Sequence, residues 1–137
     1  MTITLDAARR RDVTLLILRL ALGIIFIYHG YGKLFGGAPG IPAFTGMLAK
    51  FGFPMPAFFA WLVSITEFFG GIAMILGVLV PQVALLLAII MAVAFLVVKK
   101  AALPAGDADL ALLGMALALA LMGGGAYAVF KSGKRTP

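Results

Sequence analysis

Four ionisable side chains lie inside or beside the apolar stretches of this sequence, where ionised groups are rare. Arg19, His29 and Lys33 fall in the stretch LLILRLALGIIFIYHGYGKLF, and Glu67 falls in SITEFFGGIAMILG. A charge in hydrocarbon is costly unless it is paired or lines a polar cavity, so such residues mark a buried ion pair or a functional site. Together they could bind a quinone or an anionic ligand, or relay protons.

The first of these stretches places its charges on one helical face. At about 100° per residue, one stripe of a helix here carries Arg19, Gly23, Phe26, Gly30 and Lys33, with His29 to one side. The two glycines turn the stripe into a groove in which another helix can pack closely. Arg19 is therefore expected to point into a helix bundle and away from lipid.

Glu67 is the acidic residue that lies within the second apolar run, and we expect it to pair with Arg19. A guanidinium facing a carboxylate allows the carboxylate to ionise and to accept two hydrogen bonds. The same run has small residues that permit close helix packing, namely Gly70, Gly71 and Gly77.

Two interpretations of this polar cluster remain open. In the first, Arg19 and Glu67 form a structural ion pair that fixes how two helices dock and performs no chemistry. In the second, Arg19, Glu67, Lys33 and His29 line a cleft that binds a ligand. A cavity beside Glu67 that is lined by His29 and Lys33 would favour the second interpretation.

Composition defines the class of protein. The chain has 137 residues, of which 64% are hydrophobic and 12% charged, and its mean hydropathy is +1.15. This is too little polar surface to cover a soluble globule, so we expect an integral membrane protein. The net charge of +6 does not indicate nucleic acid, because the basic residues flank apolar runs and suit lipid headgroups and topology signals.

The residues that are missing limit the chemistry further. The sequence has no cysteine and one histidine, which excludes thiolate metal sites, iron–sulfur clusters, disulfide exchange and a bis-histidine haem within one subunit. The methionines are scattered over different segments, as is typical of core filling and not of copper binding. We expect no metal, no covalently bound cofactor and no self-sufficient active site, so a redox role would use a diffusible or partner-bound cofactor.

Four apolar runs must position these residues. They cover residues 13–32, 57–79, 82–98 and 110–130, and they lack the alternation of barrel strands. The sequence therefore predicts an all-α membrane four-helix bundle that forms one domain over residues 1–137. The third run is the shortest, and the brief connection LVPQ makes the second and third runs antiparallel neighbours.

The longer connections predict two local features. Apolar residues at helical spacing between the first two runs indicate a short amphipathic helix, with an apolar loop as the alternative; they are Ile41, Phe44, Met47, Leu48 and Phe51. Before the fourth run, Asp107 or Asp109 is expected at a helix start, where a carboxylate binds free N–H groups.

Charge asymmetry predicts the orientation. With four spans, one side carries the basic residues of both termini, and the other carries Lys33, Lys50, Lys99 and Lys100. The bias favours cytoplasmic termini in the bacterial inner membrane, with an uncleaved first span.

The residues match a known pattern. The segments RLALGIIFIYHGYGKLFG (19–36) and FGFPMPAFFAWLVSITEFFGGIAMILGVL (51–79), followed by a short third span and a fourth ending in GGGAY, resemble the DoxX family of small four-span bacterial membrane proteins. The third and fourth spans match only in hydrophobicity and glycine placement, and the polar residue that relatives often carry after the last glycines is absent. The resemblance implies a role in membrane redox or thiol homeostasis.

Three functions follow as hypotheses. The leading one is an auxiliary subunit of a membrane oxidoreductase, which contacts a quinone and a soluble or membrane-bound redox partner. The second is a small transporter or permease subunit, which would need an oligomer because four short spans enclose little volume. The third is a membrane scaffold with no chemistry of its own.

Overall fold

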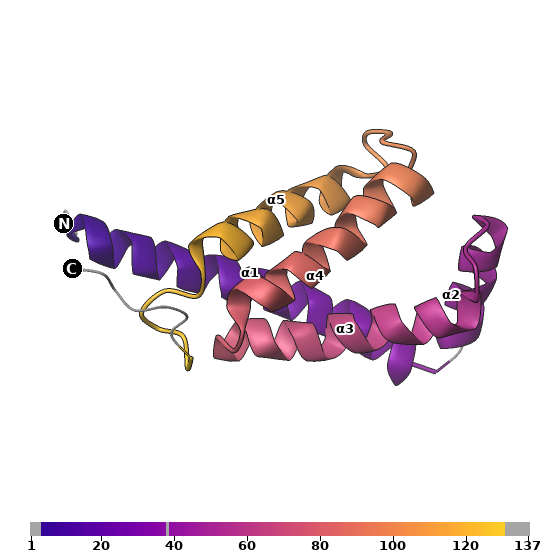
Figure 1. Cartoon of the computed structure of the whole chain (residues 1–137), viewed down its shortest axis with the longest axis horizontal. Coiled ribbons are helices and arrows are strands. Elements are labelled where there is room, and N and C mark those ends of the chain that lie inside the picture. Colours follow the sequence, from indigo (N-terminus) through magenta and orange to yellow (C-terminus); the bar gives the residue numbers. More distant parts are fainter. Residues whose placement is uncertain (1–3, 38, 131–137) are drawn as a thin grey trace.

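The computed structural model describes residues 4–37 and 39–130, and every regular element in this part of the chain is a helix. In chain order these are α1 (Ala7–Leu34), α2 (Gly40–Lys50), α3 (Pro56–Leu76), α4 (Val80–Val93), its π-helical continuation η1 (Ala94–Val98) and α5 (Asp107–Met122) (Figure 1). The expected all-helical class is confirmed for these residues. Part of the basic charge at the C-terminus lies outside the described residues, namely Lys131, Lys134 and Arg135.

Helix α1 is longer than the predicted span. The Asp6 carboxylate accepts a hydrogen bond from the backbone N–H of Arg9 at 2.8 Å and so begins the helix six residues before the apolar run. The helix has 28 residues and ends with Lys33 in its last turn. At about 1.5 Å per residue it is roughly 42 Å long, which exceeds the hydrocarbon thickness of a bilayer.

A tight turn joins α3 to α4. Gly77 ends α3 in the left-handed conformation with φ of 80°, and its N–H bonds the carbonyl oxygen of Ala73 at 2.8 Å. Pro81 lies in the first turn of α4, where backbone N–H groups have no helical partner, so the lack of an N–H on proline costs no hydrogen bond. The two helices consequently run in opposite directions from this turn, as expected.

The helices form two antiparallel pairs. Helix α1 packs along α3 and α4 packs along α5, and these two contacts are the most extensive in the described part of the chain (Figure 1). The pairs cross over a core of buried apolar side chains from all four helices: Leu15, Leu22, Phe26, Met74, Val80, Ala84, Leu87, Ala88, Met91, Ala116 and Leu119. Helix α2 contacts α1 and α3 at the end of the molecule where α1 finishes.

The expected short helix between the first two runs is confirmed as α2, with Leu48 as its buried residue. The expected helix start at Asp107 is confirmed as well. The Asp107 carboxylate accepts a hydrogen bond from the N–H of Ala108 at 2.6 Å, and Asp109 lies in the same first turn.

The predicted end of the fourth run at residue 130 is wrong. Helix α5 ends at Met122, because Gly123 and Gly125 both adopt φ of 76°, which lies outside the helical region. The chain then folds back, and the N–H groups of Val129 and Phe130 donate to the carbonyl oxygens of Leu76 (3.1 Å) and Gly77 (3.2 Å). Residues 123–130 form a strap across the end of α3, and hydropathy alone does not register such a reversal.

Three helices among the described residues are long and apolar enough to cross a membrane: α1, α3 and the continuous helix Val80–Val98. The third predicted span is thus longer than expected, since it begins at Val80. Helix α5 has 16 residues, about 24 Å, against the roughly 30 Å of a bilayer core. The protein is a multi-pass membrane protein, and the count of four spans stays a prediction.

Candidate functional site

The candidate site begins where α1 and α3 come into backbone contact. A Cβ atom added to Gly23 would lie 2.7 Å from the carbonyl oxygen of Gly71, and one added to Gly71 would lie 2.7 Å from the carbonyl oxygen of Gly23. One added to Gly30 would lie 2.5 Å from the backbone nitrogen of Phe68. Glycine is required at these positions because any side chain would push the two backbones apart. The close approach brings the far end of α1 beside the middle of α3.

The other two glycines of the second run have different neighbours. A Cβ on Gly70 would meet Val83 and Leu87 of α4 at 3.3 and 3.4 Å, so Gly70 faces α4. Gly77 lies outside the helical span as its C-cap, against Ala128 of the strap and the guanidinium of Arg19.

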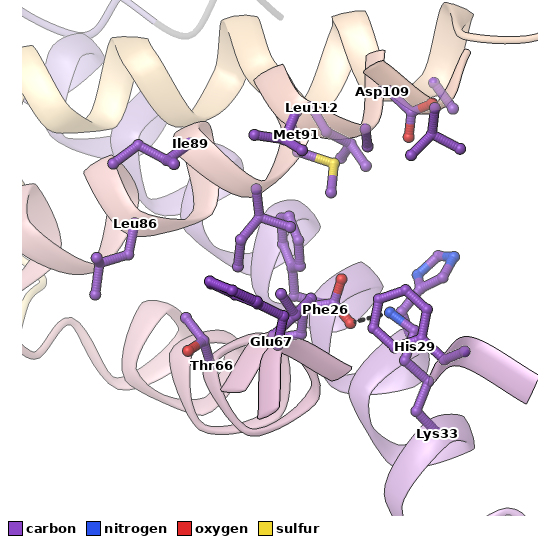
Figure 2. Close-up of a pocket in the computed structure, with 18 of the residues that line it drawn as sticks. Phe26, His29, Lys33, Thr66, Glu67, Leu86, Ile89, Met91, Asp109 and Leu112 are labelled. Atoms are coloured by element: carbon purple, nitrogen blue, oxygen red, sulfur yellow. Dashed lines mark hydrogen bonds and ion pairs between the residues drawn. The ribbon is translucent and has the colours of Figure 1, made fainter. Parts of the chain in front are cut away.

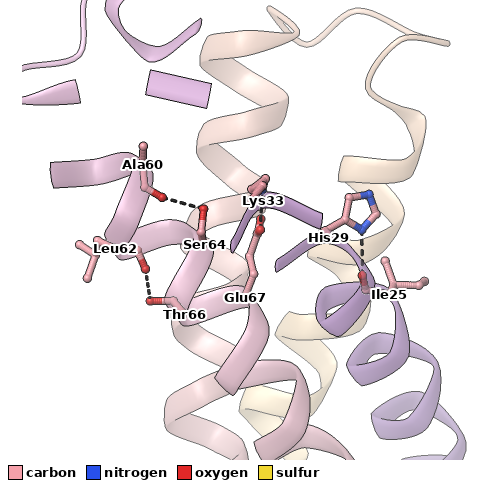
Figure 3. A network of polar contacts seen from close by, with 8 residues as sticks. All are labelled: Ile25, His29, Lys33, Ala60, Leu62, Ser64, Thr66 and Glu67. Carbon is pink, nitrogen blue, oxygen red and sulfur yellow. Dashed lines mark hydrogen bonds and ion pairs between the residues drawn. The ribbon is translucent and has the colours of Figure 1, made fainter. Parts of the chain in front are cut away.

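Glu67 forms its ion pair with Lys33. The Nζ atom of Lys33 donates a hydrogen bond to Oε2 of Glu67, and the two charges neutralise each other inside the protein (Figure 3). The Glu67 side chain is 4% exposed and that of Lys33 is 24% exposed. The Lys33 Nζ atom also lies 4.5 Å from the centre of the Phe44 ring of α2, within the range of a cation–π interaction.

The predicted pairing of Arg19 with Glu67 is wrong. Arg19 is 1% exposed and points into the bundle as expected, but its three donor nitrogens bond backbone oxygens. Nε donates to Met74 at 2.9 Å, Nη2 to Ile75 at 2.9 Å and Nη1 to Gly124 at 3.0 Å.

The antiparallel packing of α1 and α3 explains this difference. Arg19 lies in the first half of α1 and therefore faces the last turn of α3, where the carbonyl oxygens have no helical partner. Glu67 and Met74 are seven positions apart, which is about 10 Å along the helix axis and too far for one guanidinium to reach both. Arg19 and the Lys33–Glu67 pair are two separate polar sites at different depths.

A cavity of about 970 Å³ opens beside the ion pair (Figure 2). It lies between the two helix pairs, with α2 at one end, and apolar side chains form most of its wall. The polar side chains that line it are His29, Lys33, Thr66, Glu67, Lys99 and Asp109. Of the four residues in the expected cluster, His29, Lys33 and Glu67 meet at this cavity and Arg19 does not.

His29 presents one ring nitrogen that no bond within its own helix uses. Its Nδ1 atom lies 2.8 Å from the carbonyl oxygen of Ile25 (Figure 3). Because a carbonyl oxygen only accepts, we assign the proton of the neutral ring to Nδ1, which leaves Nε2 as the basic atom. The Thr66 hydroxyl donates to its own helix, to the carbonyl oxygen of Leu62 at 2.7 Å.

Three cavity residues had no functional assignment from the sequence. Lys99 looked like a topology charge, Asp109 like a helix-start residue, and Phe44 like one apolar residue of a short helix. They join the site because η1, α5 and α2 converge on it, and no local pattern in the sequence encodes that convergence. Thr66 could have been found, since it neighbours Glu67 in the chain.

The arrangement can hold a hydrophobic molecule that carries a polar group at one end. Lys33 has donor capacity beyond its bond to Glu67, Glu67 has a second carboxylate oxygen, and His29 offers a basic nitrogen. The apolar wall supplies the hydrophobic contact that such small-molecule sites require. These features place the chain in a class of protein: a small multi-pass membrane protein whose helical bundle has a buried ion pair at the edge of an apolar, ligand-sized cavity.

Comparison with known proteins identifies the family within this class. Residues 14–100 match the DoxX family, and the chain belongs to it. It is similar to a protein of Bacillus subtilis (strain 168) named "Putative oxidoreductase CatD", with 33% identity over 114 residues that cover 82% of this chain and 81% of the relative. No solved structure matches the chain.

Proposed function

We propose that this DoxX-family chain is the auxiliary membrane subunit of an oxidoreductase complex in redox or thiol homeostasis, and that its cavity receives a quinone. The observation that supports this proposal is the Lys33–Glu67 pair at the edge of a cavity of about 970 Å³ with apolar walls. A structural ion pair needs no cavity beside it, whereas a ligand site needs both the polar anchor and the apolar space.

The chemistry of the cavity suits a quinone headgroup. A quinone has carbonyl oxygens that accept hydrogen bonds and an apolar ring and tail, and it becomes a quinol by accepting two electrons and two protons. Lys33 Nζ can donate to a carbonyl oxygen, and the Glu67 carboxyl group beside it can hold a proton. His29 lines the same cavity and can accept a proton at Nε2.

The auxiliary role follows from what the sequence lacks. With no cysteine and one histidine, the chain has no residues to build an iron–sulfur or bis-histidine haem centre within one subunit. A redox role would then use a diffusible or partner-bound cofactor, and we propose that the electrons come from a partner protein that oxidises its own substrate. The name of the Bacillus subtilis relative points to the same class of reaction.

The placement in the membrane is part of the proposal. The described N-terminal end of α1 carries Arg9, Arg10 and Arg11. The end of α5 and the strap of residues 123–130 lie at the same end of the bundle, because Arg11 donates to the carbonyl oxygen of Met122 and the N–H of Ala126 donates to the Asp12 carboxylate. Positive residues at one end favour cytoplasmic termini in the bacterial inner membrane. Reporter fusions at both termini that are active only outside the cytoplasm would contradict this orientation.

The test is a measurement of bound quinone. The protein is solubilised under mild conditions, its organic extract is analysed for quinone, and co-purifying proteins are identified. We expect about stoichiometric quinone with the wild-type chain and at least about a tenfold loss with Lys33→Met, because that change removes the donor and leaves Glu67 unpaired.

Lys50→Met is the matched control, since Lys50 is exposed at the end of α2 and does not line the cavity. The double variant Lys33→Met/Glu67→Gln removes both charges, so it keeps the cavity free of an unpaired carboxylate and should also lose quinone. Absence of quinone and of any redox partner from the gently solubilised wild type would overturn the proposal. Substrate flux in proteoliposomes that Glu67→Gln abolishes would favour the transporter alternative in its place.

A further inference from the structure

The cavity has a side that lies between α3 and α4. Helices α3 and α4 share the tight turn at residues 77–79, and near this turn they touch, where Gly70 meets Val83 and Leu87. Farther from the turn, α4 packs along α5 and moves away from α3, and Figure 1 shows the ribbons of α3 and α4 diverging. Both helices contribute wall to the cavity in this divergent part.

The side chains along this divergence are both cavity lining and outer surface. Leu62 of α3 and Leu86 and Ile89 of α4 line the cavity, and each is about half exposed. Side chains at the rim of an opening meet both conditions. By contrast, Phe26 of α1 lines the same cavity and is buried, so the wall is closed at this residue.

The rim is apolar and lies at hydrocarbon depth. Leu86 and Ile89 fall near the middle of the Val80–Val98 helix, and a span of that length is centred in the bilayer core. Lys33, Lys99 and Asp109 of the cavity come from the ends of their helices, and Glu67, which lies near the middle of α3, is paired with Lys33. The opening between α3 and α4 thus faces acyl chains, and the polar end of the cavity faces the headgroup region.

We infer that the ligand enters from the bilayer through the opening between α3 and α4, and that it keeps a long isoprenoid chain in this opening while its headgroup reaches Lys33 and Glu67. This inference rests on the proposed function and specifies the ligand class, a quinone whose chain contributes to binding. A ligand that arrives from water would need no apolar rim at the middle of a span.

The structure offers a matched pair of variants to test the route. Leu86 and Leu85 are neighbours on α4 and are 51% and 52% exposed, but only Leu86 lines the cavity. Leu86→Trp fills the opening, whereas Leu85→Trp adds the same bulk on the lipid side. On α3, Leu62→Trp and Ile65→Trp form a second pair of the same kind, because Ile65 is also about half exposed and lies outside the cavity wall.

The measurement is the dissociation constant of two quinones for the full chain in nanodiscs, one with a long isoprenoid chain and one with a single isoprene unit. We expect Leu86→Trp to weaken the long-chain quinone by at least about tenfold, the effect of losing roughly two buried methylenes, and to leave the short-chain quinone within about twofold. Leu85→Trp should change neither constant.

The outcomes separate this inference from the proposed function. If the wild-type chain binds neither quinone, both fail. If both quinones bind and Leu86→Trp and Leu62→Trp leave the long-chain constant unchanged, the quinone site stands and the route is wrong. Equal weakening of both quinones would also overturn the route, because the rim would then act on the headgroup and not on the chain.

Discussion

Replacing Arg19 by Met tests the assignment of this buried cation to the end of α3. The guanidinium donates three hydrogen bonds to backbone oxygens, of Met74, Ile75 and Gly124, and its side chain is buried. Met fills similar volume but donates nothing, so the change isolates the hydrogen bonds from the packing.

The expected loss can be worked from these contacts. A hydrogen bond to a charged group contributes about 1.5–3 kcal/mol, and each carbonyl left unpaired in a buried site costs about 1–3 kcal/mol. Removing a buried charge returns part of this loss, because the charge itself was costly to bury. We expect Arg19→Met to lower the free energy of unfolding by about 3 kcal/mol, and Arg19→Lys by about half as much, since one ammonium cannot span three separate oxygens.

The assay is equilibrium unfolding in mixed micelles, followed by helical circular dichroism, with hydrogen exchange at individual amides as a local readout. Arg10→Met is the matched control, because Arg10 is exposed on the same helix. The amides of Val129 and Phe130 should exchange faster in Arg19→Met, since the strap that carries them is held in part through Gly124. Equal unfolding free energies for Arg19→Met and the wild type would refute the reasoning.

Two further predictions use the same unfolding measurement. Gly30→Ala should lower the free energy of unfolding by about 2 kcal/mol, because the added Cβ would meet the backbone of α3. Gly32→Ala is the control: it has open space around it and should raise the free energy of unfolding by up to about 1 kcal/mol. Equal effects of the two variants would contradict the close helix contact. A double-mutant cycle of Lys33→Met and Glu67→Gln should show a coupling of roughly 1–3 kcal/mol, while Arg19→Met and Glu67→Gln should add within about 0.5 kcal/mol. Strong coupling between Arg19 and Glu67 in the second cycle would contradict their separation in the structure.

The contact between α1 and α3 could be anticipated from the sequence because it depends on local spacing. A helical stripe with glycines at Gly23 and Gly30 predicts close packing whatever the partner, and an apolar run containing Gly71 is a suitable partner. The same reasoning placed Lys33 on the stripe that meets Glu67. The prediction that Arg19 is the cation paired with Glu67 was wrong. Spacing shows on which face of its helix a residue lies, but not which turn of the partner helix it meets.

Two other features could not be read in this way, for different reasons. The acceptors of Arg19 are backbone carbonyls, and every residue has one, so no residue type signals their position. The end of α5 did have a signal, since three consecutive glycines at 123–125 disfavour a helix, but hydropathy over the whole run outweighed it. Lys99 and Asp109 reach the cavity only through the crossing of the two helix pairs.

The strap of residues 123–130 has a consequence for the order of assembly. The last turn of α3 obtains its hydrogen-bond donors from Arg19, far earlier in the chain, and from Val129 and Phe130, far later. During synthesis, α1 and α3 can meet through their glycines while the carbonyl oxygens of Leu76 and Gly77 still lack these donors. The end of α3 is therefore completed only after residues 129 and 130 have been synthesised and have folded back onto it.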